Sequence, residues 1–135
     1  GEFGGDVRNT FILTYDTKLS LNGLEALIRP SQYRGQPVEL LVLSACQTAA
    51  GDDRAALGLA GVAIKAGARS ALASLWFVND QSTSALIAEV YSQLRQSPPV
   101  SKARALQAAQ IKLLTERRYR HPCYWSPYLI IGNWL

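Results

Sequence analysis

The sequence has 135 residues, which is the usual length of one globular domain or of part of one. With 48% of the residues apolar and 18% charged, there is enough material for a packed core, and the composition excludes an intrinsically disordered chain. The net charge of +4 is modest, and the basic residues are scattered apart from Arg117, Arg118 and Arg120, so we expect no nucleic-acid partner. We interpret that short basic cluster as a solvated helix end.

The sequence contains no membrane signal and few cysteines. No apolar run approaches the roughly 20 residues that span a bilayer, and no charged-then-apolar leader opens the sequence. Cys46 and Cys123 alone do not make the disulfide framework of a small secreted domain, so we expect both thiols to be reduced. These features predict a cytoplasmic chain with no membrane contact, no metal and no cofactor.

Apolar runs and turn residues predict alternating strands and helices. The expected strands are 10–15, 38–44, 70–77 and 127–132, and the expected helices are 21–28, 55–66, 82–94 and 101–114. Strand 38–44 is almost wholly apolar, which indicates a central position. Pro30 and Gly67 should end the first two helices, Gly58 and Gly61 should allow close packing, and Ser101 should cap the last helix. Together these elements predict an α/β fold with a mostly parallel sheet between helices.

Chemistry in such a sheet gathers at the carboxyl ends of its strands, where this pattern places Cys46 and the segment from Trp76 to Asp80. A thiol at a strand end suits a nucleophile, although an inert buried cysteine has the same pattern. The spacing disfavours a phosphatase loop, a zinc site and a redox pair. His121 is the sequence's one histidine and is expected to be structural. Asp80 can cap the helix that follows the second of these strands.

Several segments resemble the CHAT domain, a caspase-like cysteine peptidase module that is related to separase and found with tetratricopeptide repeats. They are VELLVLSACQTAAG (38–51), GLAGVAIKAGARSALASLWFVNDQST (58–83), ARALQAAQ (103–110) and HPCYWSPYLIIG (121–132). The blocks LSACQT and LWFVND occur in the family's order, a helix apart. The resemblance covers nearly the whole chain and implies that residues 1–135 are one partial domain with a caspase-like three-layer sandwich, incomplete at its N-terminal side.

The resemblance also implies roles for individual residues. Cys46 matches the family's nucleophile, and Gly1 matches the oxyanion-hole glycine that follows the catalytic histidine, although here it carries an amine. That histidine would lie just before Gly1, so the chain is expected to be inactive alone. Asp80 would receive a basic residue of a protein or peptide substrate, with Trp76 in the same pocket.

Two other functions stay open, a non-catalytic interaction scaffold and a doubly wound small-molecule-binding domain. The absence of a glycine-rich phosphate loop argues against the second of these. Tetratricopeptide repeats of a longer chain are the partner that the resemblance suggests. Self-association through an opened sheet edge is a further hazard.

Overall fold

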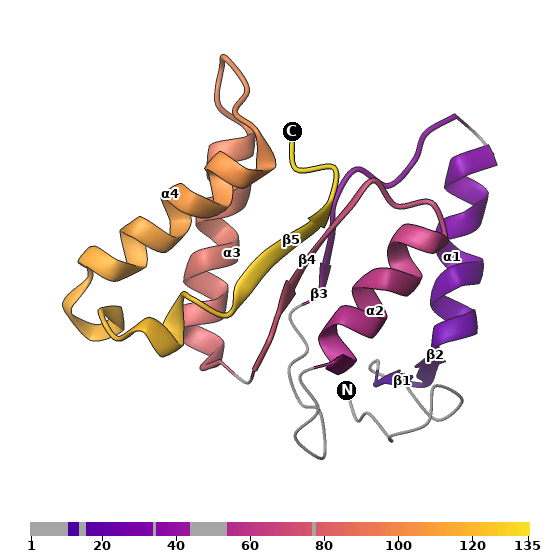
Figure 1. Ribbon diagram of the computed structural model, residues 1–135, viewed down its shortest axis with the longest axis horizontal. Coiled ribbons are helices and arrows are strands. Elements are labelled where there is room, and N and C mark those ends of the chain that lie inside the picture. The colour runs from indigo at the N-terminus through magenta and orange to yellow at the C-terminus, as the bar shows by residue number, and fades with distance from the viewer. Residues whose placement is uncertain (1–10, 14–15, 34, 44–53, 77) are drawn as a thin grey trace. The chain divides into compact units, whose positions relative to one another are not determined.

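The computed structural model describes residues 11–13, 16–33, 35–43, 54–76 and 78–135 (Figure 1). The elements in these ranges form an α/β fold, as predicted. The strands are β1 (Phe11–Leu13), β2 (Lys18–Ser20), β3 (Leu41–Leu43), β4 (Ser70–Ser74) and β5 (Tyr128–Gly132). The α-helices are α1 (Leu21–Tyr33), α2 (Arg54–Lys65), α3 (Asp80–Leu94) and α4 (Lys102–Thr115), followed by the short 3-10 helices η2 (Arg117–Tyr119) and η3 (Pro122–Tyr124).

The chain divides into two compact units. The first consists of residues 1–77 with 131–133, and the second of residues 78–130 with 134–135. In the first unit β1 and β2 form an antiparallel hairpin, with Phe11 opposite Ser20. No helix in the described part of the chain is long and apolar enough to cross a membrane.

The main sheet has the described strand order β3-β4-β5. Strands β3 and β4 are parallel, with Leu43 opposite Ala73, as the alternating pattern predicts. The backbone N–H of Asn133 donates to the carbonyl of Arg69 at 2.8 Å, which places the end of β5 beside the start of β4. Strand β5 is therefore antiparallel to β4, and the described sheet is mixed.

Strand β4, and not β3, lies in the middle of the described strand order. All five residues of β4 are buried, whereas the three residues of β3 are half-buried. The expectation of a central β3 is wrong for the described strands. An apolar run indicates that the two faces of a strand are covered by other elements, but it does not indicate how many strands lie beside it.

Small residues build the core of the first unit. Helix α2 packs on β3 and β4, and α1 packs against α2 (Figure 1). The core contains Leu24 and Ile28 from α1 together with Ala60, Ala63, Ala66, Ala68, Ala71 and Ala73 from α2, the turn after it and β4. Alanine at these positions lets the helix backbone approach the sheet closely while still burying apolar surface.

The ends of the helices in this unit test the local predictions. Ser20 caps α1, since its hydroxyl accepts a hydrogen bond from the N–H of Gly23 at 3.1 Å. Pro30 does not end α1, which continues to Tyr33. A proline this close to a helix end removes one backbone hydrogen bond but leaves less than one further turn to be held.

Helix α2 ends at Lys65, just before Gly67, as predicted. Gly67 has a φ of 107°, and the N–H of Ala68 donates to the carbonyl of Ala63 at 3.0 Å, the hydrogen bond of a Schellman motif. The prediction of close packing at Gly58 and Gly61 is wrong, because a Cβ at either position would meet no described atom within 4 Å. The α-carbons of these glycines face open space among the described residues.

The second unit is built on the helix pair α3 and α4, which pack along each other. Their contact buries Leu86 and Val90 of α3 and Ala105, Leu106, Ala109 and Leu113 of α4. Ser101 caps α4 as predicted, with its hydroxyl accepting from the N–H of Arg104 at 3.3 Å. Tyr128 anchors the start of β5 to this unit, because its hydroxyl lies 2.6 Å from that of Thr83.

Candidate functional site

Two of the four predicted site residues lie in the described part of the chain. Cys46 and Gly1 fall outside the described residues, whereas Trp76 and Asp80 are described. The described chain reaches Leu43, three residues before Cys46 in the sequence. Because β3 and β4 are parallel and Leu43 is opposite Ala73, both strands end at the same edge of the sheet.

Trp76 belongs to the first unit and follows β4 by two residues, in a bend. Its side chain is 42% exposed, which is unusual for an indole in a small domain. An exposed aromatic side chain just beyond a sheet edge can pack against a bound chain. The position therefore suits the substrate-binding role that the sequence predicts, and that role stays a prediction.

Asp80 is the first residue of α3, in the second unit, and it is exposed. The residue that caps α3 is Asn79, whose side-chain oxygen accepts hydrogen bonds from the N–H groups of Gln81 at 3.0 Å and Ser82 at 3.3 Å. The hydroxyl of Ser82 donates back to the carbonyl of Asn79 at 2.8 Å, which closes the turn. The alternative that Asp80 is the cap is therefore wrong, because the preceding residue already fills that place.

His121 has the structural role that was expected of it. Its Nδ1 accepts a hydrogen bond from the N–H of Cys123 at 3.3 Å and so caps the 3-10 helix η3. The indole N–H of Trp125 donates to the carbonyl of Arg120 at 3.4 Å and closes the same loop from the other side. Cys123 itself is exposed. These contacts fix the loop between α4 and β5.

One ionic contact ties α3 to α4 in the second unit. The carboxylate of Glu89 accepts hydrogen bonds from Gln93 at 2.6 Å and from Lys112 at 2.5 Å, and these bonds hold the pKa of Glu89 below its ordinary value of 4.5. The same carboxylate raises the pKa of Lys112 above its ordinary value of 10.5. Glu89 contributes stability that is lost as the pH falls through its folded pKa, and Lys112 contributes stability that is lost as the pH rises through its own.

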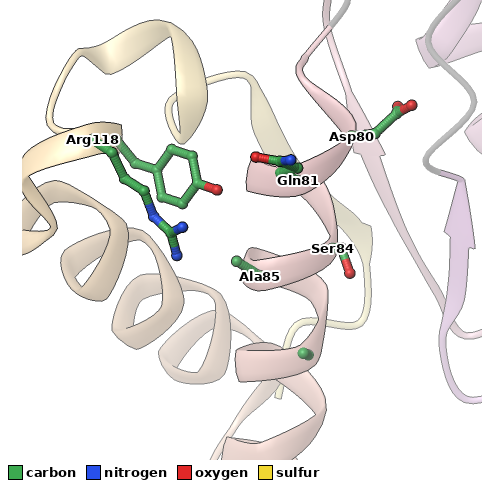
Figure 2. Close-up of a pocket in the computed structure, with 7 residues that line it drawn as sticks. Asp80, Gln81, Ser84, Ala85 and Arg118 are labelled. Carbon is green, nitrogen blue, oxygen red and sulfur yellow. The ribbon is translucent and has the colours of Figure 1, made fainter.

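The second unit also contains an open pocket of about 550 Å³ that sequence reasoning did not find (Figure 2). Its lining residues are Asp80, Gln81, Ser84, Ala85 and Ala88 from α3 and Arg118 and Tyr119 from η2. The spacing of the α3 residues marks one helix face, but nothing in the sequence indicates that η2 comes near it. In Figure 2 the carboxylate of Asp80 points away from Arg118.

The basic cluster that was expected at a helix end follows α4, which ends at Thr115. Arg118 is 69% exposed, and its Nε donates to Glu116 at 3.1 Å. Its guanidinium lies 4.6 Å from the centre of the Tyr119 ring. Within the described residues, no group of three or more His, Cys, Asp or Glu side chains could hold a metal ion.

The sheet, with two parallel strands that end at one edge, belongs to the α/β class of domains, whose ligands commonly bind beyond the strand ends. The family model named CHAT domain matches residues 4–133, and the chain therefore belongs to the CHAT domain family, which is related to the caspase-like peptidases. No curated protein and no solved structure matches the chain.

Proposed function

We propose that this chain is part of a caspase-like cysteine endopeptidase with Cys46 as its nucleophile. The observation that carries the proposal is the family match over residues 4–133, which includes the block LSACQT around Cys46. The parallel pairing of Leu43 with Ala73 supports it, because this pairing brings the ends of β3 and β4 to one edge. The blocks LSACQT and LWFVND follow these two strands in the sequence.

In this mechanism a histidine takes the proton of the Cys46 thiol, and the sulfur attacks the scissile carbonyl and forms a tetrahedral oxyanion. The oxyanion collapses to a thioester as the C–N bond breaks, and the leaving amine takes a proton from a histidine. Water then hydrolyses the thioester and restores the thiol. His121 already caps η3, so we assign the general base to a histidine outside these 135 residues. Gly1 is the matching candidate for one oxyanion donor, beside the amide of Cys46.

Asp80 gives the proposed peptidase a preference for a basic residue before the cleaved bond. Its carboxylate is exposed and is not used as the cap of α3, so it is available to a substrate. An aspartate can pair with both terminal nitrogens of an arginine, and a neutral side chain cannot replace this pair. Trp76 would contribute apolar contact to the same substrate.

The test uses the full-length protein that carries this chain and two matched peptides, with arginine or glutamine before the cleaved bond. Cleavage of the arginine peptide should be faster and should vanish in Cys46→Ala. Cys123→Ala is the matched control, because it removes the other, exposed thiol and should keep the activity. Activity that survives Cys46→Ala would refute the nucleophile. Folded protein with no cleavage and no alkylation at Cys46 would favour an interaction scaffold.

The 135 residues by themselves should show no steady turnover. Loss of a general base lowers the rate by about 10² to 10⁴-fold for proton transfer alone. Steady cleavage by the purified 135-residue chain that is abolished by His121→Ala, with β5 and η3 still folded, would show that His121 is the base.

A further inference from the structure

The pocket of the second unit has one wall that carries Arg118 and a second wall that is apolar only at Ala85 and Ala88. Arg118 with Tyr119 of η2 forms one side, and the other side is formed by Asp80, Gln81, Ser84, Ala85 and Ala88 of α3. In Figure 2 the guanidinium of Arg118 lies on the side of α3 that carries Ala85, and the carboxylate of Asp80 points to the opposite side. The charged group on the Ala85 side of α3 is therefore the guanidinium of Arg118.

Two contacts constrain the exposed side chain of Arg118. Its Nε donates to Glu116 at 3.1 Å, and its Cζ atom lies 4.6 Å from the centre of the Tyr119 ring. Tyr119 is only 5% exposed, and its ring centre is 5.6 Å from that of Tyr124. The ring that contacts the guanidinium is therefore packed against the protein. Because the contact with Glu116 uses Nε, the edge formed by the two terminal nitrogens can bind a second carboxylate in a bidentate way.

We propose that this pocket binds a peptide segment that carries an aspartate or glutamate side chain. The carboxylate pairs with the terminal nitrogens of Arg118, and the exposed Arg117 and Arg120 add attraction at longer range. Ala85 and Ala88 leave room for the peptide backbone and its small side chains, and Gln81 offers an amide to that backbone. The pocket has a volume of about 550 Å³ and is open to solvent, so an extended peptide can lie across it. The site lies wholly in the second unit and shares one lining residue, Asp80, with the proposed substrate site of the peptidase.

The experiment is a selection from a randomised heptapeptide library against three forms of the full-length protein: wild type, Arg118→Gln and Arg117→Gln. Both variants lose one positive charge, but only Arg118 lines the pocket. Peptides selected on the wild type should be rich in Asp or Glu. Their affinity, measured by fluorescence anisotropy, should fall at least about tenfold for Arg118→Gln and less than about twofold for Arg117→Gln. A photoreactive group on a selected peptide should label residues 81–88.

Three results would overturn the inference. The selected peptides could lack acidic residues, or both arginine variants could lose affinity equally, which would indicate a diffuse charge effect. Free glutamate at the same concentration could also displace the label as completely as the selected peptide, which would show that the pocket takes any carboxylate. Ala85→Leu gives a second measurement, because it fills the apolar wall without changing the charge and should also block labelling. Far-UV circular dichroism of each variant separates loss of binding from loss of fold.

Discussion

Replacing Gly132 by alanine should destabilise the first unit strongly, and the structure allows the size of the effect to be estimated. Gly132 has a φ of 93°, which L-residues with a side chain rarely adopt. A Cβ there would lie 2.5 Å from the carbonyl oxygen of Arg69 and 2.8 Å from Cδ1 of Ile64. The backbone strain costs about 1 to 2 kcal/mol and the overpacking about 1 to 3 kcal/mol, which gives a loss of about 2 to 5 kcal/mol in the free energy of unfolding.

Gly35→Ala is the matched control for this substitution. Gly35 has a φ of 69°, yet a Cβ there would meet no described atom within 4 Å. It should therefore show the backbone strain alone, and the difference between the two variants, about 1 to 3 kcal/mol, reports the close approach of β5 to the start of β4. Urea unfolding followed by far-UV circular dichroism measures both values. Equal losses for the two variants would refute the packing of Gly132 against Arg69.

Four further predictions concern residues of the helices. Asn79→Ala should lower the free energy of unfolding by about 1 kcal/mol because it removes the cap of α3, whereas Asp80→Asn should lower it less. Thermal unfolding compares the two variants, and a larger loss of stability for Asp80→Asn would refute the cap by Asn79. The same Asp80→Asn variant should lower the ratio of cleavage rates for the arginine and glutamine peptides in the proposed peptidase, and an unchanged ratio would remove Asp80 from the substrate site. Below pH 4.5 the wild type should lose stability faster than Glu89→Gln, because the pKa of Glu89 is held below that value in the folded state; parallel pH profiles would contradict the contact. Gly58→Ala should raise the free energy of unfolding by up to about 1 kcal/mol in the same urea assay, since alanine favours the helix and a Cβ there meets no described atom, and a decrease would reveal a close neighbour.

The parts of the fold that follow from neighbouring residues could be predicted from the sequence. The cap by Ser101 and the helix end at Gly67 depend on side chains or backbone angles within a few residues, and both are confirmed. The middle position of β4 and the antiparallel direction of β5 depend on residues far apart in the chain, such as Arg69 and Asn133. An apolar strand pattern is the same for either direction and either neighbour, so it could not distinguish them.

The same difference between local and long-range determinants applies to the candidate site. The motif around Cys46 is contiguous, so the sequence suffices to nominate it, and its geometry stays a prediction. At the start of α3 the sequence offers two adjacent residues that can cap a helix, Asn79 and Asp80, and only the positions of the N–H groups of Gln81 and Ser82 assign the cap to Asn79. That assignment has a chemical consequence. A carboxylate that caps a helix accepts hydrogen bonds from backbone N–H groups with its lone pairs. Because Asn79 makes these hydrogen bonds, the lone pairs of the exposed Asp80 carboxylate can accept from an arginine. The cap by Asn79 therefore supports the proposed specificity for basic substrates.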